Sequence, residues 1–155
     1  MRRNDIQPDL RDLAFDFFYW FSRFEYALKA NGYLVISQNS HQATPNWDQF
    51  VSDHRAGYSP SPAAQALMEA KPQEEVVTAH GLDFADLVFS PGTAELDKVV
   101  RYAKTVRNNL FHGGKHGSAY WDDPARMIML LGTTITVLGE LAHLGSINAD
   151  YERYY

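Results

Sequence analysis

The stretch from Pro8 to Ala30 limits the possible folds most, because it combines the apolar spacing of a long helix with clear boundary signals. Apolar side chains recur every three or four residues, as on one face of an α-helix, at positions 10, 13, 14, 17, 21, 24 and 28. Pro8 suits a first helical turn, and Asn31-Gly32 suits a helix end. Aromatic side chains make the segment apolar around much of its circumference: Phe17, Phe18, Trp20, Phe21 and Phe24. Such a helix is usually central in a bundle or buried in an interface.

Two further long helices are predicted in the second half of the chain. The first begins near Gly92-Thr93, with Thr93 as its N-cap, and ends at Gly113-Gly114, because glycine readily takes the left-handed conformation that closes a helix. The second begins at Asp122-Asp123-Pro124, where Asp can cap the helix and Pro fits its first turn, and ends at Gly145. Both carry apolar stripes at helical spacing.

Residues 31–92 form the irregular half of the chain. They predict short helices over 46–51 and 63–70, a short strand over 74–78 and a helical turn over 83–88. The chain shows no internal repeats, and its 155 residues fit one domain. We therefore expect a single all-α domain over residues 1–155, a helical bundle with three long helices and a partly irregular middle insertion.

Composition excludes several classes of protein. The chain has no cysteine, which removes disulfides, thiolate nucleophiles and cysteine-based zinc sites and is compatible with a reducing cytoplasm. The apolar run 14–24 is interrupted by Asp16, Ser22 and Arg23 and is too short to cross a bilayer. No signal peptide is recognisable behind the N-terminus. We expect a cytoplasmic protein that does not associate with membranes.

The charge is unevenly distributed. The net charge of −5 argues against a broad, non-specific nucleic-acid binder, since phosphate affinity comes from Lys and Arg. Residues 97–116 nevertheless carry a local charge of +4, from Lys98, Arg101, Lys104, Arg107 and Lys115 against Asp97. A basic run of this kind can equally be only a solvated helix face. Whether it belongs to a functional site therefore depends on the motif at its end.

Arg107 lies seven residues after Val100 and therefore on or beside the apolar stripe of its helix. An isolated buried charge costs several kcal/mol, so a guanidinium there needs a partner. Glu25 is the predicted partner, because it follows Phe21 by four residues and so lies on the buried side of the first helix. The pair can serve a site or be a purely structural salt bridge.

His112 follows Arg107 by five residues, so on an ideal helix the two side chains point about 140° apart. We expect Gly113-Gly114 to end the helix and to let His112 leave the helical path toward the Arg107 face. A lone histidine near a helix C-terminus is usually solvated. The combination with an arginine, Asn108 and a double-glycine break indicates a site.

The segment Arg107-Asn108-Asn109-Leu110-Phe111-His112 resembles the signature of HEPN domains, in which an arginine and a histidine are separated by four to six residues, often with a polar residue after the arginine. The segment 20–29 of the first helix (WFSRFEYALK) and the continuation His112-Gly113-Gly114-Lys115 look like one branch of that family. The resemblance covers the first helix and residues from about 93 to 145.

The resemblance implies a helical bundle that dimerises along its motif helices, so that two copies of Arg107 and His112 face one cleft. It implies cleavage of RNA without a metal or other cofactor, with the ribose 2′-hydroxyl as nucleophile. The setting would be phage defence or a toxin–antitoxin system, in which a partner protein can act as the inhibitory antitoxin.

The roles of single residues follow from that chemistry. His112 would move protons, and Arg107 would hold the scissile phosphate and stabilise the transition state. Asn108 would orient His112 or bind a phosphate oxygen, and Glu25 would support Arg107. Candidate RNA contacts are Lys104, Lys115 and His116.

Two alternatives remain open. His112 and His116 are four residues apart, as metal ligands on a helix can be, but glycines separate them and no third ligand stands out. The second alternative is a non-catalytic HEPN-like module for dimerisation or for binding a nucleotide or RNA. The acidic net charge fits that module slightly better, whereas the intact arginine, asparagine and histidine favour the enzyme.

Overall fold

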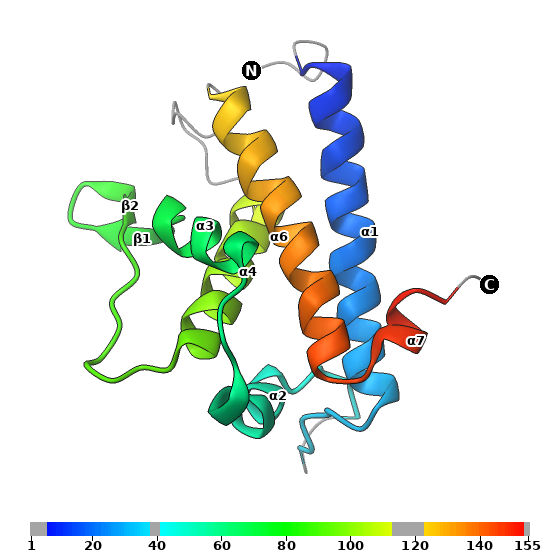
Figure 1. Cartoon of the computed structure of the whole chain (residues 1–155). Helices are drawn as coiled ribbons and strands as arrows, with labels where there is room; N and C mark the ends of the chain where they lie inside the picture. The colour runs from blue at the N-terminus through cyan, green and yellow to red at the C-terminus, as the bar shows by residue number, and fades with distance from the viewer. Residues whose placement is uncertain (1–5, 38–40, 113–122, 154–155) are drawn as a thin grey trace.

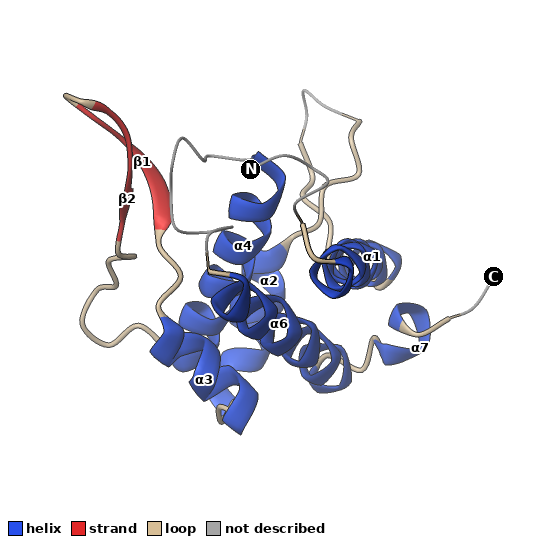
Figure 2. Cartoon of the chain, turned by 90° about the horizontal axis from the view of Figure 1, so that it is seen from above, coloured by secondary structure: helices blue, strands red, loops and turns tan. Residues whose placement is uncertain are grey.

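The structure is a computed structural model that describes residues 6–37, 41–112 and 123–153, apart from the side chain of His112. Three long helices run alongside one another (Figure 1): α1 (Pro8–Ala30), α4 (Glu95–His112) and α6 (Pro124–Leu144). The shorter helices are α2 (Trp47–His54), η2 (Arg55–Gly57), α3 (Pro62–Ala70) and α7 (Asn148–Tyr151). An antiparallel hairpin of β1 (Glu74–Thr78) and β2 (Gly81–Ala85) projects from the bundle (Figure 2).

Helix α1 has the predicted bounds and presents aromatic side chains on two faces. Phe17, Phe21 and Phe24 are buried in the core. Phe15 and Phe18 lie outside this buried face and are 66% and 47% exposed. The prediction that this helix is apolar around much of its circumference is confirmed, and the described part of the chain covers only one of its two aromatic faces.

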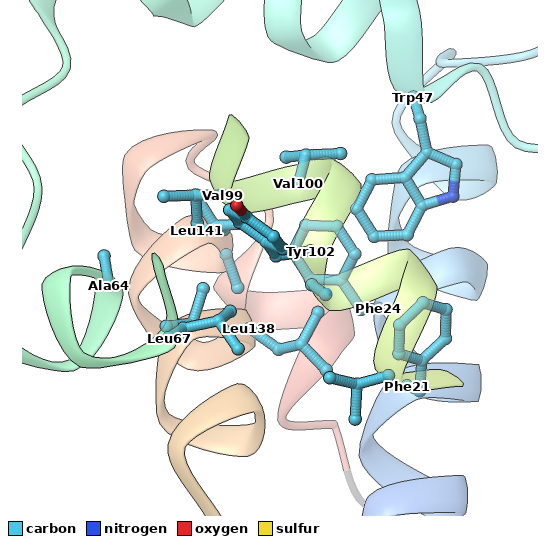
Figure 3. Close-up of a cluster of buried hydrophobic side chains, with 14 of the residues drawn as sticks. Phe21, Phe24, Trp47, Ala64, Leu67, Val99, Val100, Tyr102, Leu138 and Leu141 are labelled. Carbon is cyan, nitrogen blue, oxygen red and sulfur yellow. The ribbon is translucent and has the colours of Figure 1, made fainter. Parts of the chain in front are cut away.

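The core lies among the long helices and under α3. Helix α6 packs against α1 on one side and against α3 on the other, while α4 contacts α2, α3 and α6 (Figure 2). The buried side chains that join these elements include Leu67, Val99, Leu138 and Leu141 (Figure 3). Full burial of an aliphatic or aromatic side chain contributes about 1.5–3 kcal/mol, so this cluster supplies much of the driving force for folding.

Helix α6 begins and ends as predicted. Asp123 caps its first turn, where the side-chain Oδ1 accepts a hydrogen bond from the backbone N–H of Arg126 at 2.9 Å, and Gly145 follows its last residue. We expected no membrane-spanning segment, yet α6 alone among the described helices is long and apolar enough to cross a bilayer by length and composition. The core helix of a soluble protein meets the same criterion, and α6 buries part of its apolar surface against α1 and α3 while Ile128 and Met129 stay partly exposed.

The middle section is more regular than expected. Helices α2 and α3 and strand β1 confirm the predicted elements, but the helical turn predicted over 83–88 is wrong. Residues Gly81–Ala85 form β2, in register with β1 so that Val76 pairs with Asp83. The domain is thus mostly helical with a small two-stranded sheet, and not purely α-helical.

The predicted N-cap of α4 is also wrong. The helix begins at Glu95, and the Thr93 hydroxyl donates backwards to the carbonyl of Ser90 at 2.7 Å. Gly92 has a φ of +82°, a left-handed conformation that glycine adopts without strain. The chain therefore turns at this glycine before it enters the helix.

Gly145 should be intolerant of a side chain. A Cβ at this position would clash with the ring of Phe50, which is fully buried. We expect Gly145→Ala to lower the free energy of unfolding by about 1–3 kcal/mol, as overpacking does. Gly132→Ala in the interior of α6 is the matched control, because nothing lies within 4 Å of the point where its Cβ would stand. It should raise stability by about 0.5–1 kcal/mol, since alanine favours a helix. Urea unfolding followed by circular dichroism measures both changes, and equal stability of the two variants would contradict this packing.

Candidate functional site

Arg107 and Glu25 form the predicted ion pair between α4 and α1. Arg107 Nη2 and Glu25 Oε1 are 3.7 Å apart, and the two side chains are 35% and 25% exposed. The expectation that Glu25 is the partner of Arg107 is confirmed. The pair is half-buried, so each charge keeps some contact with solvent.

Four further groups surround this ion pair. Glu25 Oε1 also accepts a hydrogen bond from Trp47 Nε1 of α2 at 3.4 Å. Arg107 Nη1 donates to the side-chain oxygen of Asn108 at 3.0 Å. The guanidinium carbon of Arg107 lies 5.6 Å from the ring centroids of both Phe21 and Phe111, within the range of a cation–π contact. The arginine is therefore held by a carboxylate, an amide and two aromatic rings.

Local helix geometry explains this arrangement. Residues four apart on a helix are neighbours on its surface. Phe21 and Glu25 meet this condition on α1, and Arg107 and Phe111 meet it on α4. Each helix thus presents one aromatic ring and one charged group to the contact.

The two asparagines of the motif have different surroundings. Asn108 is exposed and bonded to Arg107. Asn109 is 7% exposed, and its Nδ2 donates to the backbone carbonyl of Gln73 at 2.7 Å, which holds α4 to the segment before β1. No role was predicted for Asn109. Adjacent residues on a helix point about 100° apart, so Asn108 and Asn109 must face different surroundings.

The position of His112 differs in part from the expectation. Its backbone belongs to α4, so the predicted departure of this residue from the helical path is wrong. It lies about 7.5 Å along the helix axis from Arg107. The His112 side chain, Gly113-Gly114, Lys115 and His116 lie outside the described residues. Within one chain, the described residues bring together Arg107, Glu25 and Asn108.

An exposed aromatic surface borders the site and was not predicted. The rings of Phe18 on α1 and Phe111 on α4 are 5.6 Å apart, and the two residues are 47% and 48% exposed. Phe15, one turn before Phe18, extends the same aromatic character along α1. The spacing of Phe15 and Phe18, off the buried face of α1, is the signal in the sequence from which this surface could have been found.

Lys104 lies one helical turn before Arg107 and is half-buried. It lines a cavity of about 460 Å³ whose walls come from α2, the segment 88–93 and α4. The sequence predicted Lys104 as a surface contact for RNA but did not predict a cavity, because its walls come from three separate segments.

Within residues 6–37, 41–112 and 123–153, no group of three potential metal ligands converges. No protein-family model, curated protein or solved structure matches this chain. The functional argument therefore depends on the chemistry of the groups around Arg107.

A double-mutant cycle tests the ion pair. We expect Glu25→Gln and Arg107→Gln to show a coupling energy of about 0.5–1 kcal/mol, because the pair is partly shielded from solvent. The matched control is the cycle of Arg11→Gln and Asp12→Asn, a pair at 3.3 Å whose side chains are 61% and 73% exposed. This control should give a coupling close to zero. Urea unfolding at low salt measures both coupling energies. Equal values would contradict the expectation that partial burial strengthens the Glu25–Arg107 pair.

Proposed function

We propose that this chain is a metal-independent endoribonuclease that cleaves RNA through attack of the ribose 2′-hydroxyl, at a composite site in a homodimer. The observation that carries the proposal is the environment of Arg107. A carboxylate, an amide and two rings position its guanidinium, yet about a third of the side chain stays exposed. That combination suits an arginine that must be held in place and still reach a ligand.

Arg107 has the properties of a phosphate-binding group. A guanidinium carries five N–H donors in a planar fork that matches two phosphate oxygens. At 3.7 Å, its contact with Glu25 is longer than a hydrogen bond of 2.7–3.2 Å, so the carboxylate orients the arginine without a close hydrogen bond. In the proposed reaction, Arg107 stabilises the negative charge on the non-bridging oxygens of the pentacoordinate transition state.

The reaction needs one base and one acid. The base takes the proton of the 2′-hydroxyl, whose oxygen then forms a bond to phosphorus. The bond from phosphorus to the 5′-oxygen breaks, and the acid protonates that oxygen. The products are a 2′,3′-cyclic phosphate and a free 5′-hydroxyl. Histidine suits both roles, and we assign them to the two copies of His112 in a dimer.

The aromatic surface beside the site supports this dimer. Phe15, Phe18 and Phe111 are at least 47% exposed, and Phe111 contacts the guanidinium of Arg107. A second copy that covers this surface would remove these rings from water, which is favourable, and would bring a second motif to the same cleft. The activity fits a cytoplasmic role in phage defence or in a toxin–antitoxin system, where a partner protein restrains it.

Two observations favour a second candidate function. Glu25 already neutralises Arg107 in the free protein, and the net charge of the chain is −5. Both features suit a non-catalytic module for dimerisation or for binding a nucleotide or RNA. The two candidates differ in whether RNA is cut.

Cleavage in the presence of EDTA tests the proposal. The purified protein should cut single-stranded RNA and leave 2′,3′-cyclic phosphate ends. His112→Ala should lower the rate at least about 100-fold, since general acid–base catalysis contributes 10²–10⁴-fold. His143→Ala is the matched control, because His143 is an exposed histidine on α6 and pairs with Glu152 at 3.5 Å. It should cut RNA at the wild-type rate.

Two results would overturn the proposal. Undiminished cleavage by the His112→Ala protein would remove the assigned acid and base. A wild-type protein that cuts RNA as a monomer at micromolar concentration, in light scattering, would contradict the composite site.

A further inference from the structure

The cavity lined by Lys104 has walls from α2, from Arg55 of η2, from the segment 88–93 and from residues 97–104 of α4. Its volume of about 460 Å³ falls within the range of small-molecule sites, roughly 300–1,000 Å³. Charged side chains from α2, η2 and α4 line it, including the carboxylates of Asp48 and Asp97, and Phe89 forms an aromatic wall. A cavity of this size and polarity can hold a ligand with a flat ring and several hydrogen-bonding groups.

Asp97 gives the cavity an acceptor that lacks a donor. Its Oδ2 is buried and has no hydrogen-bond partner among the described residues. Asp97 lies in the first turn of α4, where the helix dipole favours a negative charge. The dipole explains why a carboxylate is tolerated there, but it does not supply the missing N–H or O–H donor. The oxygen has almost no accessible surface, so a bound ligand with an N–H group would satisfy it after the Asp97 side chain turns toward the cavity.

The cavity also offers positive charge. Arg101 is engaged, since its Nη1 donates to the carbonyl of Val88 at 2.9 Å and its guanidinium lies 5.3 Å from the ring centroid of Phe89. The side chains of Arg55 and Lys104 have no ion pair or hydrogen bond to the part of the chain that the structure describes. These two side chains are therefore available to an anionic or carbonyl group of a ligand.

Guanine matches this set of groups better than the other bases do. Its N1–H and N2–H donors lie side by side, and a carboxylate accepts such a pair through its two oxygens. Its O6 and N7 acceptors are the groups that Arg and Lys bind most often. Adenine, cytosine and uracil each place an acceptor next to the donor that would face Asp97, and a carboxylate repels that acceptor.

The position of the cavity connects it to the proposed site. Lys104 precedes Arg107 by three residues, about 4.5 Å along the axis of α4. Asp97 lies about 15 Å from Arg107 along the same axis. The cavity therefore begins one helical turn from Arg107 and continues toward the N-terminal end of α4. A strand of RNA with a phosphate at Arg107 can place a nearby base in it.

We infer that this cavity binds the guanine base of a nucleotide near the scissile phosphate, so that the RNA is cut at a fixed distance from a guanosine. The inference rests on the proposed ribonuclease function and names the substrate class of that site. Asp97 reads the donor edge of the base. Arg55 and Lys104 supply donors for its O6 or for a phosphate, and Phe89 contacts its face.

Nucleotide binding tests the cavity without RNA cleavage. Isothermal titration of the whole protein with guanosine 5′-monophosphate should give an affinity at least tenfold above that for the adenosine, cytidine and uridine monophosphates. Asp97→Asn keeps the size of the side chain but replaces one acceptor oxygen with a donor, so it should remove this preference. Asp12→Asn, an exposed carboxylate on α1, is the matched control and should leave all four affinities unchanged. Equal affinities for the four nucleotides in the wild-type protein would overturn the inference.

Cleavage mapping separates the inference from the function on which it rests. Oligoribonucleotides with a single guanosine at successive positions should be cut at a constant offset from it by the wild-type protein. The Asp97→Asn protein should cut the same oligoribonucleotides at positions that do not follow the guanosine. Cleavage independent of guanosine in the wild-type protein overturns the cavity's role and leaves the ribonuclease intact. Selective binding of guanosine monophosphate without any cleavage overturns the ribonuclease and supports the cavity as a guanine site.

Discussion

The packing of Trp47 against α1 is the interaction on which the arrangement of the site depends. Its ring stacks on Phe24 with centroids 4.9 Å apart and lies 5.7 Å from Phe21, which fixes α2 against α1 (Figure 3). The same side chain donates its Nε1–H to Glu25, and Glu25 pairs with Arg107. Apolar packing thus determines where a carboxylate stands, and the carboxylate determines where the guanidinium of α4 points.

Helix α4 contributes residues to three features of the molecule: the cavity, the ion pair and the exposed aromatic surface. The cavity lies along its first half, Arg107 follows one turn after Lys104, and Phe111 joins the exposed aromatic surface near its end. Cleavage of RNA at a chosen position uses a base contact for specificity, a phosphate contact and a proton-transfer group. The proposed function assigns the phosphate contact to Arg107 and the proton transfer to His112, and the further inference assigns the base contact to Asp97. Because one rigid helix carries all three residues, their spacing along its axis does not depend on loop conformation.

Helical spacing and boundary residues predicted the bounds of α1 and α6, because these signals lie within one segment. The same spacing placed Glu25 and Arg107 on the apolar sides of their two helices, and their pairing was predicted because a charge there needs a partner. Strand β2 was missed because the hairpin is largely exposed, with Val77 and Leu82 83% and 60% exposed, so burial imposes no clear alternation on its sequence. The start of α4 was misplaced because the chain turns at Gly92, and Thr93, the plausible cap that follows, bonds back to Ser90 instead of capping the helix. The cavity was not predictable, because residues from α2, the segment 88–93 and α4 meet only through tertiary packing.

The central claim is that Arg107 and His112 of one chain form half of an active site. Mixing wild-type protein with the His112→Ala protein, after exchange of subunits, tests this claim most directly. If both histidines are needed, hybrid dimers are inactive, and an equal mixture should keep about a quarter of the activity of the same total amount of wild-type protein. If each chain acts alone, the mixture keeps about half, and that result would contradict the account.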